Sequence, residues 1–329
     1  MPRPGPRNLI TDVDGLHVGN AEDAVLRSGV TVLLCESAMR AGVDVRGGGP
    51  GSRETDVLRP ENLVGEVHGL VLSGGSVFGL AAADGVCALL SGRSVGLALG
   101  ETAPRVPIVP AAVLYDLDNG GDKDWGEEPP YRGLGRQAAE TAAENFALGA
   151  HGAGRGARAG LVAGGLGSAS LDLGEGLTVG ALVAANPVGS VLMPDGETYW
   201  AWPFELDGEF GGRPPPGPVE ASDPMPEQSR LQARGRLAPG SNTTVAIVAC
   251  SAALSTAECR RVAIMAHDGL ARAVRPAHTS FDGDTVFALS AGRYQLGNGF
   301  ERAAELARIG SAAADCLARA IARAVHFAT

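Results

Sequence analysis

The stretch Gly240-Ser241-Asn242-Thr243-Thr244-Val245-Ala246-Ile247-Val248-Ala249-Cys250 places hydroxyl residues at the entrance of an apolar, β-branched run. Such a run is typical of a buried strand. The segment before it, residues 207–239, is polar and rich in proline, which predicts a flexible linker. A flexible segment that leads into a hydroxyl at the start of a rigid strand fits a chain that cuts itself between Asn242 and Thr243. An ordinary threonine-rich strand start after a loop would give the same pattern.

Cleavage of the Asn242–Thr243 bond would give Thr243 a free α-amine beside its own hydroxyl. The amine has a pKa of about 7.7–8.0, so much of it is neutral at a slightly alkaline pH. A neutral amine can take the proton from the hydroxyl, which is a weak nucleophile until a base acts on it. The pattern therefore predicts Thr243 as a nucleophile that the chain makes for itself.

Composition excludes several classes of protein. The net charge of −10 over 329 residues argues against nucleic acid or an anionic membrane as a partner. The five cysteines are scattered without a C-x-x-C pair, and the six histidines without H-E-x-x-H, so we expect neither disulfides nor a metal site. The chain has no signal-peptide pattern and no apolar run near the roughly 18 residues of a membrane span. We expect a cytoplasmic protein without cofactors.

Hydrophobic periodicity predicts alternating strands and helices. The expected strands are residues 30–35, 68–73, 177–185, 245–250 and 285–289. The expected helices run up to Leu90, over 135–148, from a capping box at 255–258 to before Pro276, and over 301–326. Strands with helices before and after them predict an α/β fold, a four-layer α/β/β/α sandwich in a single domain over residues 1–329.

Gly74-Gly75-Ser76 lies between a predicted strand and a predicted helix. This arrangement is similar to a phosphate cradle, because the first N–H groups of a helix bind anions. The phosphate-loop, dinucleotide and G-x-S-x-G patterns are all absent from the sequence. We expect either close helix–strand packing here or an active-site wall whose N–H groups form a substrate pocket or oxyanion loop.

Eight sequence blocks, spread over nearly the whole chain, resemble the DmpA-type aminopeptidases, a family that includes the β-peptidyl aminopeptidases and the nylon-oligomer hydrolase NylC. The blocks are TDVDGLHVG (11–19), RGGGPG (46–51), LSGGSVFGL (72–80), VPAAVLYD (109–116), GAG (152–154), NPVG (186–189), NTT (242–244) and HTSFDGDT (278–285). The resemblance implies an N-terminal-nucleophile-like fold and self-cleavage into residues 1–242 and 243–329. It also implies assembly as a homotetramer.

The same resemblance implies roles for individual residues. The implied nucleophile is Thr243, the last residue of the larger subunit is Asn242, and the other implied site residues are Asn186, Tyr115, Asp282 and Asp284. The β-peptidyl aminopeptidases have a serine nucleophile and carry Ser and Glu at the paired-carboxylate positions. The threonine together with Asp-x-Asp therefore places this chain nearer to NylC.

Side-chain chemistry is compatible with these roles. Asp282 and Asp284 stand two apart at a strand entry and can point to one face, where each raises the pKa of the other. One of them could accept a hydrogen bond from Thr243 while the other holds it in place. The side-chain N–H of Asn186 could stabilise an oxyanion by roughly 3–4 kcal/mol. Ordinary alternatives are a turn at Asp-Gly-Asp, a turn at Asn186, and a core-rim position for Tyr115.

One feature departs from the family pattern. A lysine is expected after the Gly-Ala-Gly block, at the position of Leu161 in NylC-like chains or near Ala163 in the β-aminopeptidases. This chain has its only lysine at Lys123. Arg155 or Arg158 could supply a positive charge, but an arginine does not act as a base. The departure predicts a difference in the role of a lysine in processing or in the strength of activity, and a different substrate pocket.

The sequence as a whole predicts an amide hydrolase that acts on short peptides with a free amine, or on linear oligoamides of the 6-aminohexanoate type. Two alternatives stay open. An acyltransferase would use an amine in place of water, as in the ornithine acetyltransferase-like proteins. A small-molecule binding or scaffold protein would remain uncut.

Overall fold

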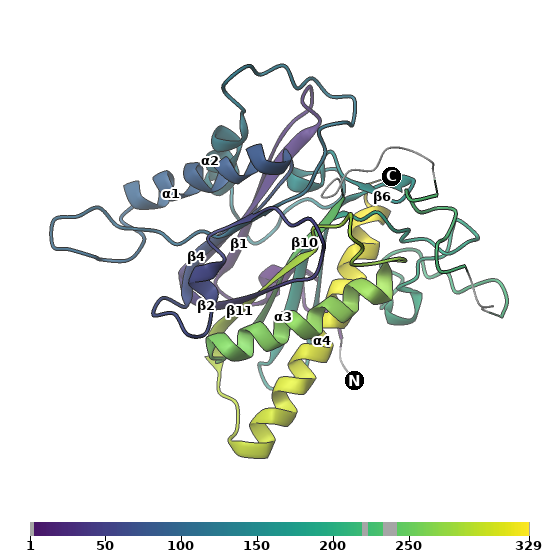
Figure 1. The fold of residues 1–329 in the computed structure, drawn as a ribbon. Helices are drawn as coiled ribbons and strands as arrows, with labels where there is room; N and C mark the ends of the chain where they lie inside the picture. Colours follow the sequence, from purple (N-terminus) through teal and green to yellow (C-terminus); the bar gives the residue numbers. More distant parts are fainter. Residues whose placement is uncertain (1–2, 219–222, 233–241, 329) are drawn as a thin grey trace.

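The computed structural model describes residues 3–218, 223–232 and 242–328 (Figure 1). Its main strands are β1 (Leu16–Asp23), β2 (Ser28–Val45), β3 (Ser52–Arg53), β4 (Glu66–Ser73), β5 (Ala111–Val113), β8 (Gly165–Asp172), β9 (Thr178–Asn186), β10 (Thr243–Ala252) and β11 (Thr285–Tyr294); β6 (Arg158–Ala159) and β7 (Val162–Ala163) form a separate pair. The α-helices are α1 (Ala82–Gly92), α2 (Tyr131–Glu140), α3 (Thr256–Ala273) and α4 (Gly299–His326), and short 3-10 helices cover Ile10–Asp12, Asp56–Leu58, Ser76–Ala81, Gly152–Gly154 and Trp202–Phe204. Within the described part of the chain, no helix is both long and apolar enough to cross a membrane.

The long strand β2 joins the two halves of the main sheet. The strand order is β3-β5-β4-β2-β11-β10-β9-β8, with β1 also paired to β2. Residues 30–34 of β2 pair with β4, whereas residues 40–45 pair with β11. A single hydrogen-bonded sheet therefore supplies two layers, because β2 belongs to both of them.

Three apolar clusters separate four layers. The first lies between α1/α2 and the half-sheet of β2 and β4, the second lies between the two half-sheets, and the third lies between β8–β11 and α3/α4. Successive residues of β2 face different clusters, since Val32 packs toward α1 and α2 while Leu33 packs between the half-sheets. Figure 1 shows α1 and α2 on one side of the molecule and α3 and α4 on the other. The predicted α/β/β/α sandwich is confirmed.

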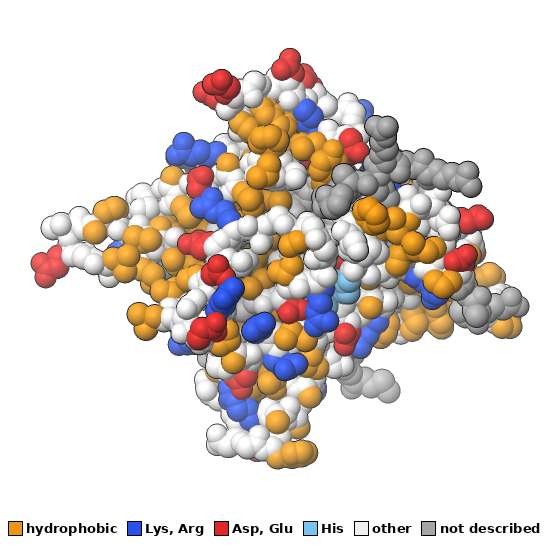
Figure 2. All heavy atoms as spheres, in the orientation of Figure 1, with side chains coloured by type: hydrophobic (Ala, Val, Ile, Leu, Met, Phe, Trp, Pro, Cys, Tyr) orange, Lys and Arg blue, Asp and Glu red, His pale blue; other side chains and the backbone are white. Residues whose placement is uncertain are grey.

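The capping box at Ser255 forms as predicted. The Ser255 hydroxyl accepts from the Glu258 N–H at 3.3 Å, and the Glu258 carboxylate accepts from the Ser255 N–H at 2.8 Å. The helix that follows, α3, is amphipathic. Its buried side packs on α4 and β2. Over its outer face, acidic and basic side chains are interspersed (Figure 2).

The predicted helix over 135–148 is wrong in its extent, because α2 ends at Glu140. Two interactions compete with continuation of the helix beyond Glu140. The Thr141 hydroxyl donates to carbonyl oxygens of the last turn, at 3.1 Å and 3.3 Å. The backbone of Ala143 then pairs with Val18 of β1 at 2.9 Å and 3.1 Å. Tertiary pairing therefore overrides the helical preference of this alanine-rich segment.

Strand β8 was not predicted, because glycine is uncommon inside strands and the segment is rich in it. A Cβ on Gly167 would lie 1.9 Å from the carbonyl oxygen of Ala320 in α4, and one on Gly165 would lie 2.2 Å from that of Ala324. Glycine at both positions allows the helix backbone to rest directly on the strand. The glycine-rich stretch is thus a close-packed strand.

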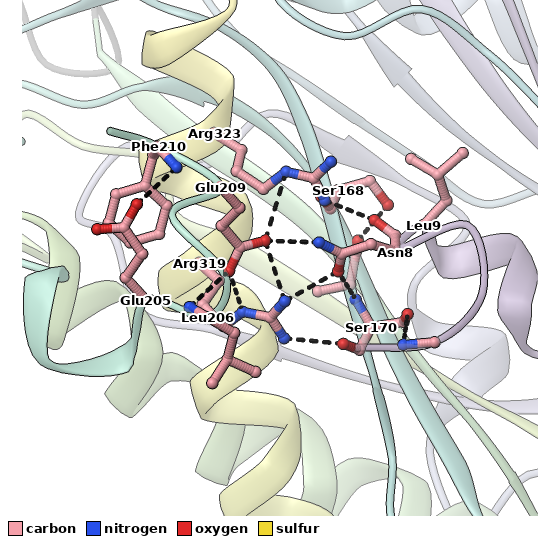
Figure 3. A network of polar contacts seen from close by, with 12 residues as sticks. Asn8, Leu9, Ser168, Ser170, Glu205, Leu206, Glu209, Phe210, Arg319 and Arg323 are labelled. Carbon is pink, nitrogen blue, oxygen red and sulfur yellow. Dashed lines mark hydrogen bonds and ion pairs between the residues drawn. The ribbon is translucent and has the colours of Figure 1, made fainter. Parts of the chain in front are cut away.

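The segment predicted as a linker, residues 207–239, begins with anchored residues. Figure 3 shows the Glu209 carboxylate between Arg319 and Arg323 of α4, with Asn8 beside it. Glu209 and Arg319 are almost fully buried, and Phe210 is in the core. Residues 219–222 and 233–241, which include Gly240 and Ser241, lie outside the described residues, so the flexibility of the segment stays a prediction.

Candidate active site

Strand pairing brings four of the predicted site residues to one end of the sheet. Thr243 is the first residue of β10, and its register partner in β9 is Asn186, the last residue of that strand. On the other side of β10, the backbone of Asn242 forms an isolated parallel β-bridge with that of Asp282. All four are at most 2% exposed.

The carbonyl oxygen of Asn242 accepts two hydrogen bonds. One comes from the Gly283 N–H at 2.9 Å, and the other comes from the Thr243 hydroxyl. A Cβ on Gly283 would lie 2.7 Å from the Thr243 hydroxyl oxygen and 2.7 Å from the Gly49 carbonyl oxygen, so the site has no room for a side chain there. The Thr243 hydroxyl therefore contacts the carbonyl group of the Asn242–Thr243 peptide, and the Gly283 N–H donates to the oxygen of the same carbonyl.

Gly283 was not among the residues predicted from the sequence. It lies between the two predicted carboxylates, inside the block HTSFDGDT. The ordinary interpretation of Asp-Gly-Asp as a turn conceals this N–H donor, because a turn glycine and a glycine that donates its N–H have the same sequence pattern. Only the register of β10 beside this loop brings its N–H to Asn242.

Asp284 supports the start of β10 from one side. Its Oδ1 accepts from the Thr244 N–H at 2.8 Å. Its Oδ2 accepts from the backbone N–H of His278 at 3.2 Å and lies 2.8 Å from the Nδ1 of the same residue. The Asp284 carboxylate thus reaches the backbone of the residue next to Thr243, which fits the second of the two predicted roles, that of holding Thr243 in place.

Asp282 fixes the loop that follows β9. Its Oδ1 accepts from the Val188 N–H at 3.1 Å, and its Oδ2 accepts from the Thr279 N–H at 2.9 Å and hydroxyl at 2.6 Å. Burial, and then the charge of Asp284, raise the pKa of Asp282 to about 6. The prediction that close carboxylates push one pKa upward therefore fits the geometry.

The raised pKa of Asp282 makes stability depend on pH. Between pH values of about 4 and about 6 the folded chain keeps the proton that the unfolded chain has lost. Folding takes up a proton in this range, so the free energy of unfolding falls as the pH rises, by at most about 3 kcal/mol. We expect urea unfolding of Thr243→Ala, in which the sequence predicts no self-cleavage, to show this loss, and Thr243→Ala/Asp282→Asn to lack it. Equal pH slopes in the two proteins would contradict the prediction.

The Asn186 side chain is held at both ends. Its Nδ2 donates to the carbonyl oxygen of Tyr115 at 3.0 Å, and its Oδ1 accepts from the Arg158 N–H at 2.9 Å. Tyr115 is half-buried, and burial together with the nearby Asp118 and Asp116 raises its phenolic pKa. The structure thus brings Tyr115 to the site, where its backbone carbonyl orients the asparagine amide.

Arg230 enters the site from the segment predicted as a linker. Its Nη2 lies 2.9–3.0 Å from the carbonyl oxygens of Arg158, Asn186 and Pro187, and 3.4 Å from the Oδ1 of Asn186. The backbone N–H of Arg230 donates to the Val188 carbonyl oxygen at 2.9 Å. Burial lowers the pKa of Arg230 to about 10. Sequence reasoning missed this residue, since an arginine among prolines and polar residues carries no signal.

The backbone N–H groups of Gly74, Gly75 and Ser76 are engaged within the chain. They donate to the Gly29 carbonyl oxygen at 2.9 Å, to the Asp116 carboxylate at 2.7 Å and to the Leu114 carbonyl oxygen at 2.9 Å, respectively. Gly75 has a φ of 82°, and a Cβ there would lie 2.1 Å from the Tyr131 ring. These contacts favour the close-packing alternative over an oxyanion loop.

The chain is similar to several known proteins. A family model described as peptidase family S58 matches residues 8–329. An uncharacterized aminopeptidase of Mycobacterium tuberculosis is 44% identical over 95% of this chain and 92% of its own length. A 6-aminohexanoate-oligomer endohydrolase of a Kocuria species is 29% identical over 89% of this chain and 77% of its own length.

A solved structure of similar fold is the L-aminopeptidase D-Ala-esterase/amidase of Ochrobactrum anthropi, described as a variant of the Ntn hydrolase fold. It superposes with a TM-score of 0.69 at 21% identity, over 98% of this chain and 86% of that one. The likeness confirms the predicted fold class, and the sequence matches confirm the resemblance.

Proposed function

The chain belongs to peptidase family S58, and on this premise we propose that it is a self-processing amide hydrolase whose nucleophile is Thr243. The observation that carries the proposal is the Asn242 carbonyl oxygen, which lies between the Thr243 hydroxyl and the Gly283 N–H. A nucleophile and an oxyanion donor thereby meet at one peptide bond.

Self-cleavage begins with attack of the Thr243 hydroxyl oxygen on the Asn242 carbonyl carbon. The negative charge that develops on the carbonyl oxygen is stabilised by the Gly283 N–H. The C–N bond breaks, the hydroxyl proton ends on the released amine, and an ester links Asn242 to the Thr243 side chain. Water then hydrolyses the ester and leaves a carboxylate on Asn242 and a free α-amine on Thr243.

Hydrolysis of a substrate amide uses the same nucleophile, the Thr243 hydroxyl, and the same oxyanion donor, the Gly283 N–H. Once Asn242 has left, the Gly283 N–H is free to receive the carbonyl oxygen of a substrate, with the nearby Asn186 amide as a second donor. The α-amine of Thr243 removes the proton from its hydroxyl, which attacks the substrate and forms an acyl-enzyme. Water releases the acyl group. Suitable substrates are short peptides with a free amine and linear oligoamides.

The test is product analysis of purified protein with short peptides and 6-aminohexanoate oligomers, with and without an added amine acceptor. Hydrolysis yields a free carboxylate and a free amine in equal amounts. A product joined to the added amine would instead favour the acyltransferase alternative. An intact chain that turns over none of these amides would favour the binding-protein alternative.

Arg230 is expected to act through Asn186 as a positioning residue. Arg230→Met removes the donor that holds the carbonyl and Oδ1 of Asn186, so we expect kcat to fall by about 10-fold to 100-fold with KM nearly unchanged. Arg230→Lys, which keeps a cation but not the planar donor, should recover part of the loss. A raised KM at unchanged kcat would assign Arg230 to substrate binding instead.

A further inference from the structure

A pocket of about 460 Å³ adjoins the Asn186 end of the site. Its lining includes Arg27, Arg155, Arg158, Leu161, Val162 and Ala163. One lining residue is hydrogen-bonded to the site, and another lies close to a site residue in sequence. The Arg158 N–H donates to the Asn186 side chain, and Tyr115, which accepts from the same side chain, is four residues before Asn119.

Three arginines line this pocket, and they lack carboxylate partners. Among the residues that the structure describes, no carboxylate oxygen lies within 4.0 Å of the guanidinium nitrogens of Arg27, Arg155 or Arg158. Arg27 and Arg155 instead reach carbonyl oxygens, at 3.3 Å and 3.5 Å. Most other arginines described, such as Arg53 and Arg136, pair with an acidic side chain. The donors of this pocket are therefore available to an anion.

A buried acid, Asp116, lies close to one wall of the pocket. Asp116 lies behind the Gly156 wall, where a Cβ on the glycine would be 2.7 Å from the Asp116 Oδ2, and Asp116 is only 1% exposed. Burial raises the pKa of Asp116, whereas hydrogen bonds from Ser28 and Gly75 and the positive charge of Lys123 act in the opposite direction. The lining itself keeps three positive charges and holds no acidic residue.

Part of the lining is aliphatic. Leu161, Val162 and Ala163 belong to it, Ala163 pairs with Arg158 between β6 and β7, and Leu161 is 52% exposed. These are also the positions at which the family pattern led us to expect a lysine. Small apolar side chains provide a surface for methylene groups, whereas the arginines provide paired donors for a carboxylate.

We propose that this pocket binds a carboxylate carried on an aliphatic arm of the substrate, so that the enzyme selects short amides with an acidic end. The proposal rests on the proposed function, because the pocket would hold the part of the substrate next to the amide that Thr243 attacks. A planar guanidinium matches a carboxylate with two parallel hydrogen bonds, which a neutral carboxamide cannot replace.

The first test compares two substrates that differ only at the end, a short oligoamide with a terminal carboxylate and the same oligoamide with a terminal carboxamide. We expect wild type to prefer the acid by about 10-fold or more in kcat/KM, and Arg27→Gln/Arg155→Gln to lose most of this preference. Arg136→Gln, on the exposed face of α2, is the matched control and should keep the wild-type ratio. Leu161→Glu adds a negative charge at an exposed position and should also lower the ratio.

The second test measures binding without turnover. Hexanoate and hexanamide are titrated into the Thr243→Ala protein by calorimetry, and we expect hexanoate to bind about 10-fold or more tightly than hexanamide. This preference should be lost in Thr243→Ala/Arg27→Gln/Arg155→Gln and kept in Thr243→Ala/Arg136→Gln. The Leu161→Glu change, which is at the surface, repeats the test if the double arginine variant does not fold.

The two tests separate this proposal from the proposed function. If wild type hydrolyses acid and carboxamide equally and hexanoate binds no better than hexanamide, the carboxylate pocket is overturned while the hydrolase stands. If wild type hydrolyses neither substrate but hexanoate binds as expected, the pocket stands and the hydrolase fails. A preference for the acid that survives Arg27→Gln/Arg155→Gln would overturn the assignment of the pocket.

Discussion

Replacing Thr243 by alanine is expected to leave the chain in one piece and to lower kcat/KM for amide hydrolysis by at least about 10³-fold. The substitution removes the hydroxyl that contacts the Asn242 carbonyl oxygen. No α-amine is then released, so both the nucleophile and its base are lost together. The loss should appear in kcat, measured by product formation from the peptides or oligoamides that wild type cleaves.

Thr244→Val is the matched control for this experiment. Thr244 is the next residue of β10, fully buried, and its hydroxyl has no hydrogen-bond partner among the described residues. Valine keeps its shape and removes only an unsatisfied polar group, which is close to neutral for stability. We expect this variant to be cut and to hydrolyse amides like wild type. Equal losses in both variants would point to damage of β10 and not to a missing nucleophile.

Replacing Arg319 by methionine is expected to lower the free energy of unfolding by about 3–5 kcal/mol. The Arg319 guanidinium is 1% exposed and binds the buried Glu209 carboxylate, the Ser170 carbonyl oxygen and the Asn8 side chain (Figure 3). Without it, Glu209 keeps hydrogen bonds from Asn8 and the Leu206 N–H, but its nearest cation is the more distant Arg323, at 3.6 Å. The measurement is urea unfolding of Thr243→Ala and Thr243→Ala/Arg319→Met, so that both proteins are single chains.

An exposed ion pair serves as the control for Arg319. Arg213 and Glu197 are 3.2 Å apart with most of their side-chain surface exposed, so Arg213→Met should change stability by less than about 1 kcal/mol. Similar losses for the two arginines would contradict a special role for the buried cluster.

The Arg319 cluster also bears on the proposed cleavage. Arg319 and Arg323 belong to residues 243–329, whereas Glu209, Asn8 and Ser170 belong to residues 1–242. Together with the pairing of β10 to β9, the cluster would hold two separate pieces as one molecule. Assembly of such molecules into a homotetramer, and a cytoplasmic location, stay predictions.

Sequence reasoning placed the parts of the fold that have a clear period. Strand β10 and helices α3 and α4 follow from apolar runs and from a capping box, because these signals are local. It missed β8, since its glycines serve a helix that lies far away in sequence, and it extended α2 too far, since β1 captures the next residues. In each case a tertiary contact decided the local structure.

The candidate site divides in the same way. The resemblance of sequence blocks to a known family led to Thr243, Asn186, Asp282 and Asp284, and the chemistry of each residue type is compatible with its implied role. The N–H of Gly283 and the guanidinium of Arg230 could not be found from sequence. Their contributions depend on a strand register and on the path of a proline-rich segment, neither of which leaves a local pattern.

The most direct test of the account is intact mass under denaturing conditions, with wild type beside Thr243→Ala. We expect wild type to give two masses, those of residues 1–242 and 243–329, and the variant to give the single mass of the whole 33.4 kDa chain. A wild-type chain that stays whole after long incubation, or a Thr243→Ala chain cut at the same bond, would contradict the proposal that Thr243 creates its own active site.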